Sequence, residues 1–139
     1  MKRKKWFSIT GLFFVILLTA CDNNAQQKTN TGQPIINFVT KEFDFGIINE
    51  GEKVQYKFKF VNSGNGDLVI RSAEASCGCT VPKFSDKPIR PGEEGEIEVE
   101  FNSEGKPGAA AKTITVRSNT NPEVTTLTIK GEVIPKAKK

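Results

Sequence analysis

Apolar and polar residues alternate along this chain from Ile35 onward, and no other feature constrains its fold as much. In the clearest run, Val54–Phe60, apolar side chains are separated by Gln55, Lys57 and Lys59. Successive side chains of a β-strand point to opposite faces, so a period of two predicts strands with one buried and one solvated face. The same alternation recurs at residues 43–45, 96–101, 113–117 and 126–130.

Turn-forming residues separate the alternating runs. They cluster at residues 49–52, 62–66, 90–93, 104–108 and 119–122. About six to eight short strands, with a turn roughly every 8–12 residues, are typical of an immunoglobulin-like β-sandwich. The sequence therefore predicts an all-β fold of about seven strands. A small β-barrel is the alternative, because the pattern distinguishes the two only weakly.

The N-terminus carries a different pattern. Met1–Lys5 is basic, Trp6–Ala20 is mostly apolar, and small residues lead into Cys21. A basic start, a short apolar run and a small-residue exit are typical of a secretory signal peptide. The alternative is an uncleaved transmembrane helix, but the apolar run of 15 residues is shorter than the roughly 20 that such a helix needs.

The phrase Leu18-Thr19-Ala20-Cys21 resembles the lipobox of bacterial lipoproteins. That resemblance implies cleavage before Cys21, a lipid on its sulfur, and an acyl chain such as palmitate on the new amino terminus. Two or more chains anchor a protein stably, whereas one anchors it only marginally. We therefore expect a lipid-anchored protein of the bacterial cell envelope, on its periplasmic or extracellular face.

The predicted organisation has four parts. Residues 1–20 form the signal peptide, 21–34 the lipidated Cys and a flexible polar tether, 35–134 the sandwich domain, and 135–139 a basic, solvated tail. Four of the 20 Lys and Arg residues lie in the signal peptide, which leaves 16 against 16 Asp and Glu. A neutral chain without a clustered basic surface is not expected to bind nucleic acid.

One phrase in the middle of the chain points to a known family. Cys77-Gly78-Cys79-Thr80 follows Phe43-Asp44-Phe45-Gly46 and precedes Pro91-Gly92 and Gly105-Lys106-Pro107-Gly108. On these residues the chain resembles the bacterial domain of unknown function numbered fifteen seventy-three, over roughly Phe38–Val133. The resemblance implies an immunoglobulin-like module in a secreted or lipid-anchored envelope protein. It implies no biochemical activity.

Cys77 and Cys79 admit three interpretations. On a regular strand they would share a face with Ala75 and Val81 and could be small buried side chains. An oxidising envelope favours a disulfide between them instead. A regular strand holds such Cα atoms about 6.6–6.8 Å apart, at the limit for a disulfide, but Gly78 would let the backbone curl. Two thiolates could also bind Cu(I), which is the one cofactor that the sequence suggests.

Two further segments have a functional and a structural interpretation. The acidic stretch Glu93–Glu100 could bind a cation, but alternate carboxylates on a strand stand about 6.6–6.8 Å apart, too far for all to reach one ion. We predict a solvated outer face, paired across strands with Lys57 and Lys59. Asn62–Gly66 could be a ligand loop, but its composition favours a plain hairpin turn.

Catalysis has little support, because the chain has no His. Neither a Ser-His-Asp nor a Cys-His pair can form, and two Cys without His do not complete a tetrahedral zinc site. We therefore expect a non-enzymatic interaction or structural domain with a protein partner, bound at a sheet edge or through end loops. The alternative is a thiol-redox or copper-binding envelope protein that uses Cys77 and Cys79.

Overall fold

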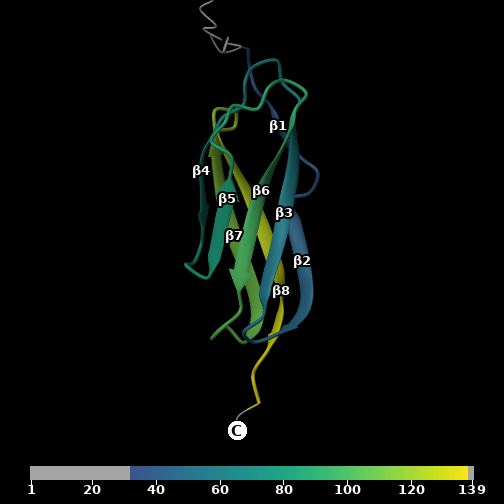
Figure 1. Cartoon of the computed structure of the whole chain (residues 1–139), viewed down its shortest axis with the longest axis vertical. Helices are drawn as coiled ribbons and strands as arrows, with labels where there is room; N and C mark the ends of the chain where they lie inside the picture. Colours follow the sequence, from purple (N-terminus) through teal and green to yellow (C-terminus); the bar gives the residue numbers. More distant parts are fainter. Residues whose placement is uncertain (1–31, 138–139) are drawn as a thin grey trace, which may run out of the picture.

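The computed structural model describes residues 32–137 as two packed four-stranded sheets (Figure 1). The strands of the first sheet, in spatial order, are β1 (Ile36–Phe38), β3 (Lys53–Asn62), β6 (Glu94–Asn102) and β5 (Thr80–Phe84). Those of the second are β2 (Glu42–Asn49), β8 (Val124–Ile134), β7 (Gly108–Ser118) and β4 (Ile70–Ala75). The predicted all-β sandwich is confirmed, and within residues 32–137 the sheets do not close into a barrel.

The core lies between the sheets and comes mainly from the four central strands. Their inward positions are the apolar members of the alternating runs, and each is at most 2% exposed: Phe58, Phe60, Ile97, Val99, Phe101, Ile114, Val116, Leu127 and Ile129. Burying one such side chain stabilises a fold by about 1.5–3 kcal/mol. The period of two therefore fixes which face of each sheet is buried, and the packed core is a rigid frame for the loops.

The N-terminal strand region is shared between the two sheets. β1 pairs antiparallel with the end of β3, and the chain then crosses over, so that β2 pairs parallel with β8. The ring of Phe43 on β2 stacks on that of Tyr56 on β3, with centroids 3.8 Å apart, and closes the gap between the sheets. Gly46, at φ +70°, lies at the bulge in β2, where a side chain would be strained.

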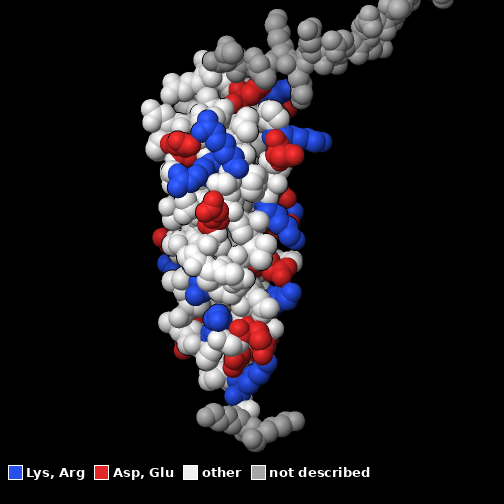
Figure 2. All heavy atoms as spheres, turned by 90° about the vertical axis from the view of Figure 1, so that its left-hand side faces the viewer, with Lys and Arg blue, Asp and Glu red and all other residues white. Residues whose placement is uncertain are grey.

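The edge strand β5 is protected against pairing with another chain. The carbonyl of Cys79 accepts a hydrogen bond from the Asn102 amide of β6. Because backbone groups of alternate residues point to opposite sides of a strand, those of Pro82 point away from β6 and toward the open edge. Proline has no N–H to offer there. Figure 2, which faces the side of β4 and β5, shows acidic and basic side chains interspersed, and these also discourage edge pairing.

Ion pairs cover the outer face of the first sheet. Lys57 lies 2.6 Å from Glu96 and 3.7 Å from Glu98, and Lys53 lies 3.1 Å from Glu100. The hydrogen bond with Glu96 raises the pKa of Lys57 above its usual value. The acidic stretch is therefore a paired outer face, as predicted for Lys57; Lys59 lies opposite Glu96 in the strand register, but no ion pair of it is seen among residues 32–137. Because these groups are exposed, the pairs contribute little to stability.

The loops lie at two opposite ends of the sandwich. The described chain enters at Gly32 beside the loops at 63–69, 85–93 and 119–123, which we call the entry end. The loops at 50–52, 76–79 and 103–107 lie at the other end, together with the chain after β8, and we call this the distal end (Figure 1). The strands run between the two ends, so the fold separates them by the full length of the sandwich.

The segment 62–66 is not a hairpin turn, and that prediction is wrong. The segment follows β3 and leads to β4, and these strands lie in different sheets, so the segment starts a crossover. Asn62 is fully buried there. Its Nδ2 donates to the carbonyls of Gly66 and Ile89 at 2.8 and 2.9 Å. Its Oδ1 accepts from the amides of Gly64 and Ile35 at 3.1 and 3.3 Å.

The end of the predicted tether packs onto the entry end. The Gln33 amide donates to Oδ1 of Asn65 at 2.8 Å, the Asn65 amide donates to the Gln33 carbonyl at 3.0 Å, and Pro34 is buried. Cys21, the predicted signal peptide and residues 138–139 of the predicted tail lie outside the described residues. Across residues 32–137, no helix is long and apolar enough to cross a membrane.

Candidate functional site

Cys77 and Cys79 lie in the turn between β4 and β5, at the distal end. They do not continue a regular strand, which the first of the three interpretations required, because the chain turns here to pass from one sheet to the other. The turn also shifts the inward register. Thr80 is 3% exposed, whereas Val81, expected to share the face of the cysteines, is 50% exposed. Both cysteines are half-buried and Gly78 is exposed.

A disulfide joins Cys77 and Cys79. Their Cα atoms are 5.3 Å apart, closer than on a regular strand and within the range of ordinary disulfides. The Thr80 amide donates to the Cys77 carbonyl at 3.2 Å, which closes the turn. The bond links residues only two positions apart. A loop this short removes little entropy from the unfolded chain, so the loop-length relation gives only about 1.5 kcal/mol of stabilisation.

Backbone hydrogen bonds hold the cysteine turn on both sides. The Ser76 amide donates to the carbonyl of Thr113 on β7 at 2.9 Å. The Asn102 amide at the end of β6 donates to the Cys79 carbonyl, also at 2.9 Å. Inside the turn, the Thr80 hydroxyl oxygen lies 3.7 Å from the Cys77 sulfur. The two sheets therefore position both cysteines through contacts that do not involve the disulfide.

A shallow surface hollow lies beside the disulfide. The cysteine turn forms one side, and Asn102, Glu104 and Lys106 form the other. Glu104 is paired with Lys136, Nζ to Oε1 at 2.8 Å, and this hydrogen bond raises the pKa of Lys136. Among residues 32–137, Lys106 makes no ion pair. The hollow thus combines a disulfide with an exposed positive charge.

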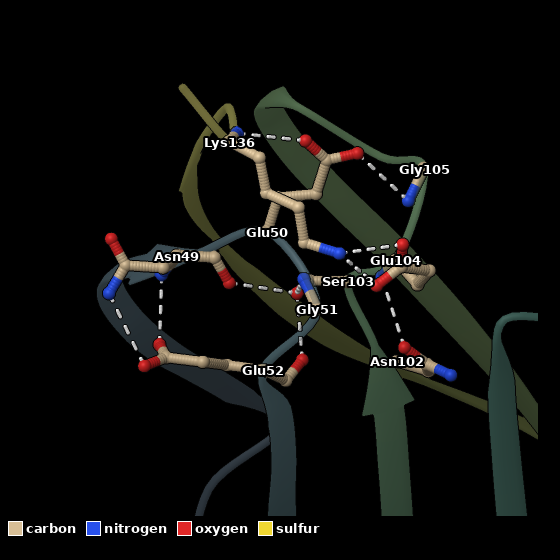
Figure 3. A network of polar contacts seen from close by, with 9 residues as sticks. All are labelled: Asn49, Glu50, Gly51, Glu52, Asn102, Ser103, Glu104, Gly105 and Lys136. Carbon is tan, nitrogen blue, oxygen red and sulfur yellow. Dashed lines mark hydrogen bonds and ion pairs between the residues drawn. The ribbon is translucent and has the colours of Figure 1, made fainter. Parts of the chain in front are cut away.

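A polar network stiffens the rest of the distal end (Figure 3). Its centre is Ser103, which is fully buried. The Ser103 hydroxyl lies 2.7 Å from the Glu52 carbonyl and 3.1 Å from the Asn49 carbonyl, and it accepts a hydrogen bond from the Gly51 amide at 2.9 Å. One side chain of the β6–β7 loop therefore fixes the turn between β2 and β3.

Glu50 connects that turn to two further segments. Its carboxylate accepts from the Gly105 amide at 3.1 Å and from the Lys136 amide at 3.0 Å (Figure 3). The side chain of Lys136 then reaches Glu104, as described above. Lys136, in the predicted solvated tail, is exposed, and it also ties the chain after β8 to the β6–β7 loop. The distal end is accordingly a set of loops held in one arrangement.

The sequence reasoning missed Ser103, Glu50 and Lys136. The sequence does contain a signal for Ser103. It lies two residues after Phe101 and four after Val99, so it is expected to point to the same buried face. A polar residue in such a position needs a buried hydrogen-bond partner. The partners of Glu50 and Lys136 lie far away in the sequence, at Gly105 and Glu104, and no local pattern reveals them. Across residues 32–137, no group of three or more His, Cys, Asp or Glu residues converges as metal ligands.

Replacing Ser103 with alanine is expected to lower the free energy of unfolding by about 1–3 kcal/mol, because it removes the buried hydroxyl that bonds the Gly51 amide and the Glu52 carbonyl. Denaturant unfolding of the variant and the wild type measures the difference. Ser63→Ala, at an exposed position of the entry end, is the matched control and should leave the midpoint unchanged. Equal midpoints for Ser103→Ala and the wild type would contradict the assigned role.

Comparisons with known proteins place the fold but no activity. A family model described as "Protein of unknown function (DUF1573)" matches residues 36–133. No curated protein matches the sequence. A protein of unknown function from Porphyromonas gingivalis W83 is 17% identical with a TM-score of 0.64, and the match covers 78% of this chain and 51% of that one.

Two other solved structures share the fold. The ASH / PapD-like domain 7 of human CEP192 is 12% identical with a TM-score of 0.56, and the match covers 96% of this chain and all of that domain. The secreted serine protease VesC from Vibrio cholerae is 12% identical with a TM-score of 0.57, and the match covers 74% of this chain and 24% of that one. The chain thus spans about half of the Porphyromonas protein and a quarter of VesC.

Proposed function

The chain belongs to the family of proteins of unknown function whose model matches residues 36–133, and from that premise we propose that it is a lipid-anchored cell-envelope protein. Its immunoglobulin-like domain binds a protein partner through its distal end. The proposed role is non-enzymatic. The anchor is the lipid on Cys21, and the partner is another envelope protein. The observation that carries the choice of surface is the network of Ser103, Glu50 and Lys136, which holds the distal loops in one arrangement.

Rigidity favours loops as a binding surface. A loop that is already ordered loses little conformational entropy when a partner binds, so more of the contact energy becomes affinity. At the distal end the turn after β2 and the loop after β6 share Ser103, and the chain after β8 joins them through Lys136. The cysteine turn lies beside the same β6–β7 loop. These segments therefore lie side by side at the distal end.

Strand addition is the less favoured mode. A partner strand at β5 would need an N–H where Pro82 has none. The short strand β1 pairs only with residues 60–62 of β3, and the outer face beside the rest of β3 carries Lys53 and Lys57, whose charges oppose strand pairing there. Of the two binding modes expected for a sandwich, binding through the distal loops therefore fits this structure better than strand addition at a sheet edge.

The anchor and the binding surface lie on opposite sides of the domain in this proposal. The described chain begins at Gly32, at the entry end, and residues 22–31 separate it from Cys21. Ten residues span at most about 35 Å when extended, so the domain stays near the membrane. With the chain attached at the entry end, the distal loops are the part that an approaching partner can reach most freely.

Photo-crosslinking in intact cells tests this proposal. A photo-reactive amino acid replaces Glu52 or Lys106 at the distal end, and Lys87 or Asn121 at the entry end as the matched exposed controls. We expect the two distal positions to give a crosslinked product of the same mass, and the two entry-end positions to give none. A product formed from the entry end alone would refute the assigned surface.

A further inference from the structure

The proposed binding role does not explain why Cys77 and Cys79 are joined by a disulfide at the distal end. We propose that Cys77 and Cys79 form a thiol–disulfide exchange site that reacts with cysteine pairs of other envelope proteins. The inference rests on the placement of the pair in the turn and does not require the lipid on Cys21; the cysteine turn is also part of the proposed distal surface. Three observations carry it: the span of the bond, the support of the turn and access from the hollow.

The bond holds no separate parts of the fold together. It joins two positions of a single turn, whereas the strands before and after it are held by their own ladders, β4 to β7 and β5 to β6. A structural disulfide gains most when it closes a long loop. A bond that stabilises so little is better explained by its chemistry than by its contribution to folding.

The turn keeps the two sulfurs together in both redox states. Hydrogen bonds from Ser76 to Thr113 and from Asn102 to Cys79 fix the backbone on either side, and neither involves sulfur. In the disulfide the two Cα atoms are 5.3 Å apart. After reduction, the same hydrogen bonds keep them close enough for the disulfide to form again. Pre-positioned groups react as if at high effective concentration, so the pair can open and close again without refolding the domain.

A reacting partner can reach the sulfurs. Both cysteines are partly exposed, and the hollow lined by Asn102 and Lys106 leaves space beside them. Exposed disulfides are the labile ones, whereas buried structural disulfides resist exchange. The exposed ammonium of Lys106 attracts an incoming thiolate electrostatically.

The reaction balances with a protein dithiol as the only co-reactant. A thiolate of the partner attacks one sulfur of the Cys77–Cys79 bond, a mixed disulfide forms, and the other cysteine leaves as a thiolate. The second thiolate of the partner then attacks the partner's first sulfur in the mixed disulfide and releases the remaining cysteine of this protein as a thiolate. Two electrons and two protons pass from the partner dithiol to Cys77 and Cys79, which become thiols, while the partner becomes a disulfide. The reverse reaction starts from a disulfide of the partner.

The first test is a redox titration of the wild-type, full-length protein in detergent. The probes are mixtures of reduced and oxidised glutathione, followed by alkylation and peptide mass mapping of Cys77 and Cys79. We expect the pair to open and close reversibly, and the reduced and oxidised forms to share the same unfolding cooperativity. A pair that stays oxidised throughout, or a domain that unfolds on reduction, would overturn the proposal.

The second test traps the partner in cells. Each single variant, Cys77→Ser or Cys79→Ser, leaves one thiol that can form a mixed disulfide but cannot resolve it. At least one of them should give adducts on non-reducing gels that disappear with dithiothreitol, and the double variant should give none. Adduct levels in the double variant equal to those of both single variants would refute exchange. Stoichiometric copper on extracted wild-type protein, lost in Cys77→Ser, would assign the pair to metal binding instead.

Discussion

Replacing Asn62 with leucine is expected to lower the free energy of unfolding by about 3–5 kcal/mol, which approaches half the stability of many domains. Asn62 is fully buried, and its amide group serves four backbone groups, among them the Gly66 and Ile89 carbonyls. Leucine has a similar volume but no polar atoms. The two buried hydrogen bonds to Gly66 and Ile89 would then be lost, together with those from Gly64 and Ile35, and the crossover from β3 to β4 would lose its support.

Equilibrium unfolding in guanidinium chloride measures this loss. Asn37→Leu, at an exposed position of the adjacent strand β1, introduces the same side chain without removing a buried amide. It should change the stability by less than 1 kcal/mol, as most surface substitutions do. A similar small change for Asn62→Leu would show that the crossover does not depend on this side chain.

Replacing Cys21 with serine is expected to move nearly all of the protein from the membrane fraction to the soluble fraction or to stop its processing. Serine has no sulfur to carry the lipid, and without acyl chains no stable anchor remains. Metabolic labelling with an alkyne analogue of palmitate, followed by fractionation, reports both properties at once. Cys21 lies outside the residues that the structure describes, so this experiment tests the sequence-based part of the account.

Cys77→Ser is the matched control for that experiment, because it also replaces a cysteine with serine but leaves Cys21 in place. It should keep both the label and the membrane association of the wild type. If Cys21→Ser retained the label and still sedimented with membranes, the chain would be attached in another way, and the interpretation of residues 18–21 as a lipobox would be wrong.

The alternation of side chains was sufficient to predict the sandwich. In β3 and β6 the inward residues Phe58, Ile97 and Phe101 are those that the period of two selects, because packing two sheets demands one apolar face from each. The charged outward positions also lie as predicted, with Lys57 between Glu96 and Glu98. This part of the fold depends on local sequence, and local sequence therefore revealed it.

The loops could not be predicted in the same way. Asn62 looks like part of a hairpin in the sequence, but its partners include Ile89, far along the chain. Cys77 and Cys79 have the spacing of a strand, yet the need to change sheets turns the backbone between β4 and β5. In both cases the conformation depends on which sheet the next strand joins. That choice is made by long-range packing and is not encoded in a few neighbouring residues.

The polar network of the distal end was the part of the structure that the sequence predicted least well, although it consists of ordinary polar residues. Ser103, Glu50 and Lys136 contact segments that are distant in the sequence. Glu50 and Lys136 alone are typical of a solvated turn or tail, and the parity of Ser103 indicates burial but not its partners. Only the folded arrangement shows that they hold three segments together. The candidate surface is therefore a property of the tertiary structure, whereas the cysteine pair beside it is visible in the sequence.

Hydrogen exchange of the full-length protein, alone and in its detergent-extracted complex, tests the central claim that the distal end is the binding surface. The account predicts slower exchange on complex formation in the backbone amides of residues 50–52, 76–79 and 103–107. The amides of the entry end, at 63–69 and 85–93, should exchange at the same rate in both samples. Slower exchange confined to the entry end, or to the edge strand β5, would contradict the account.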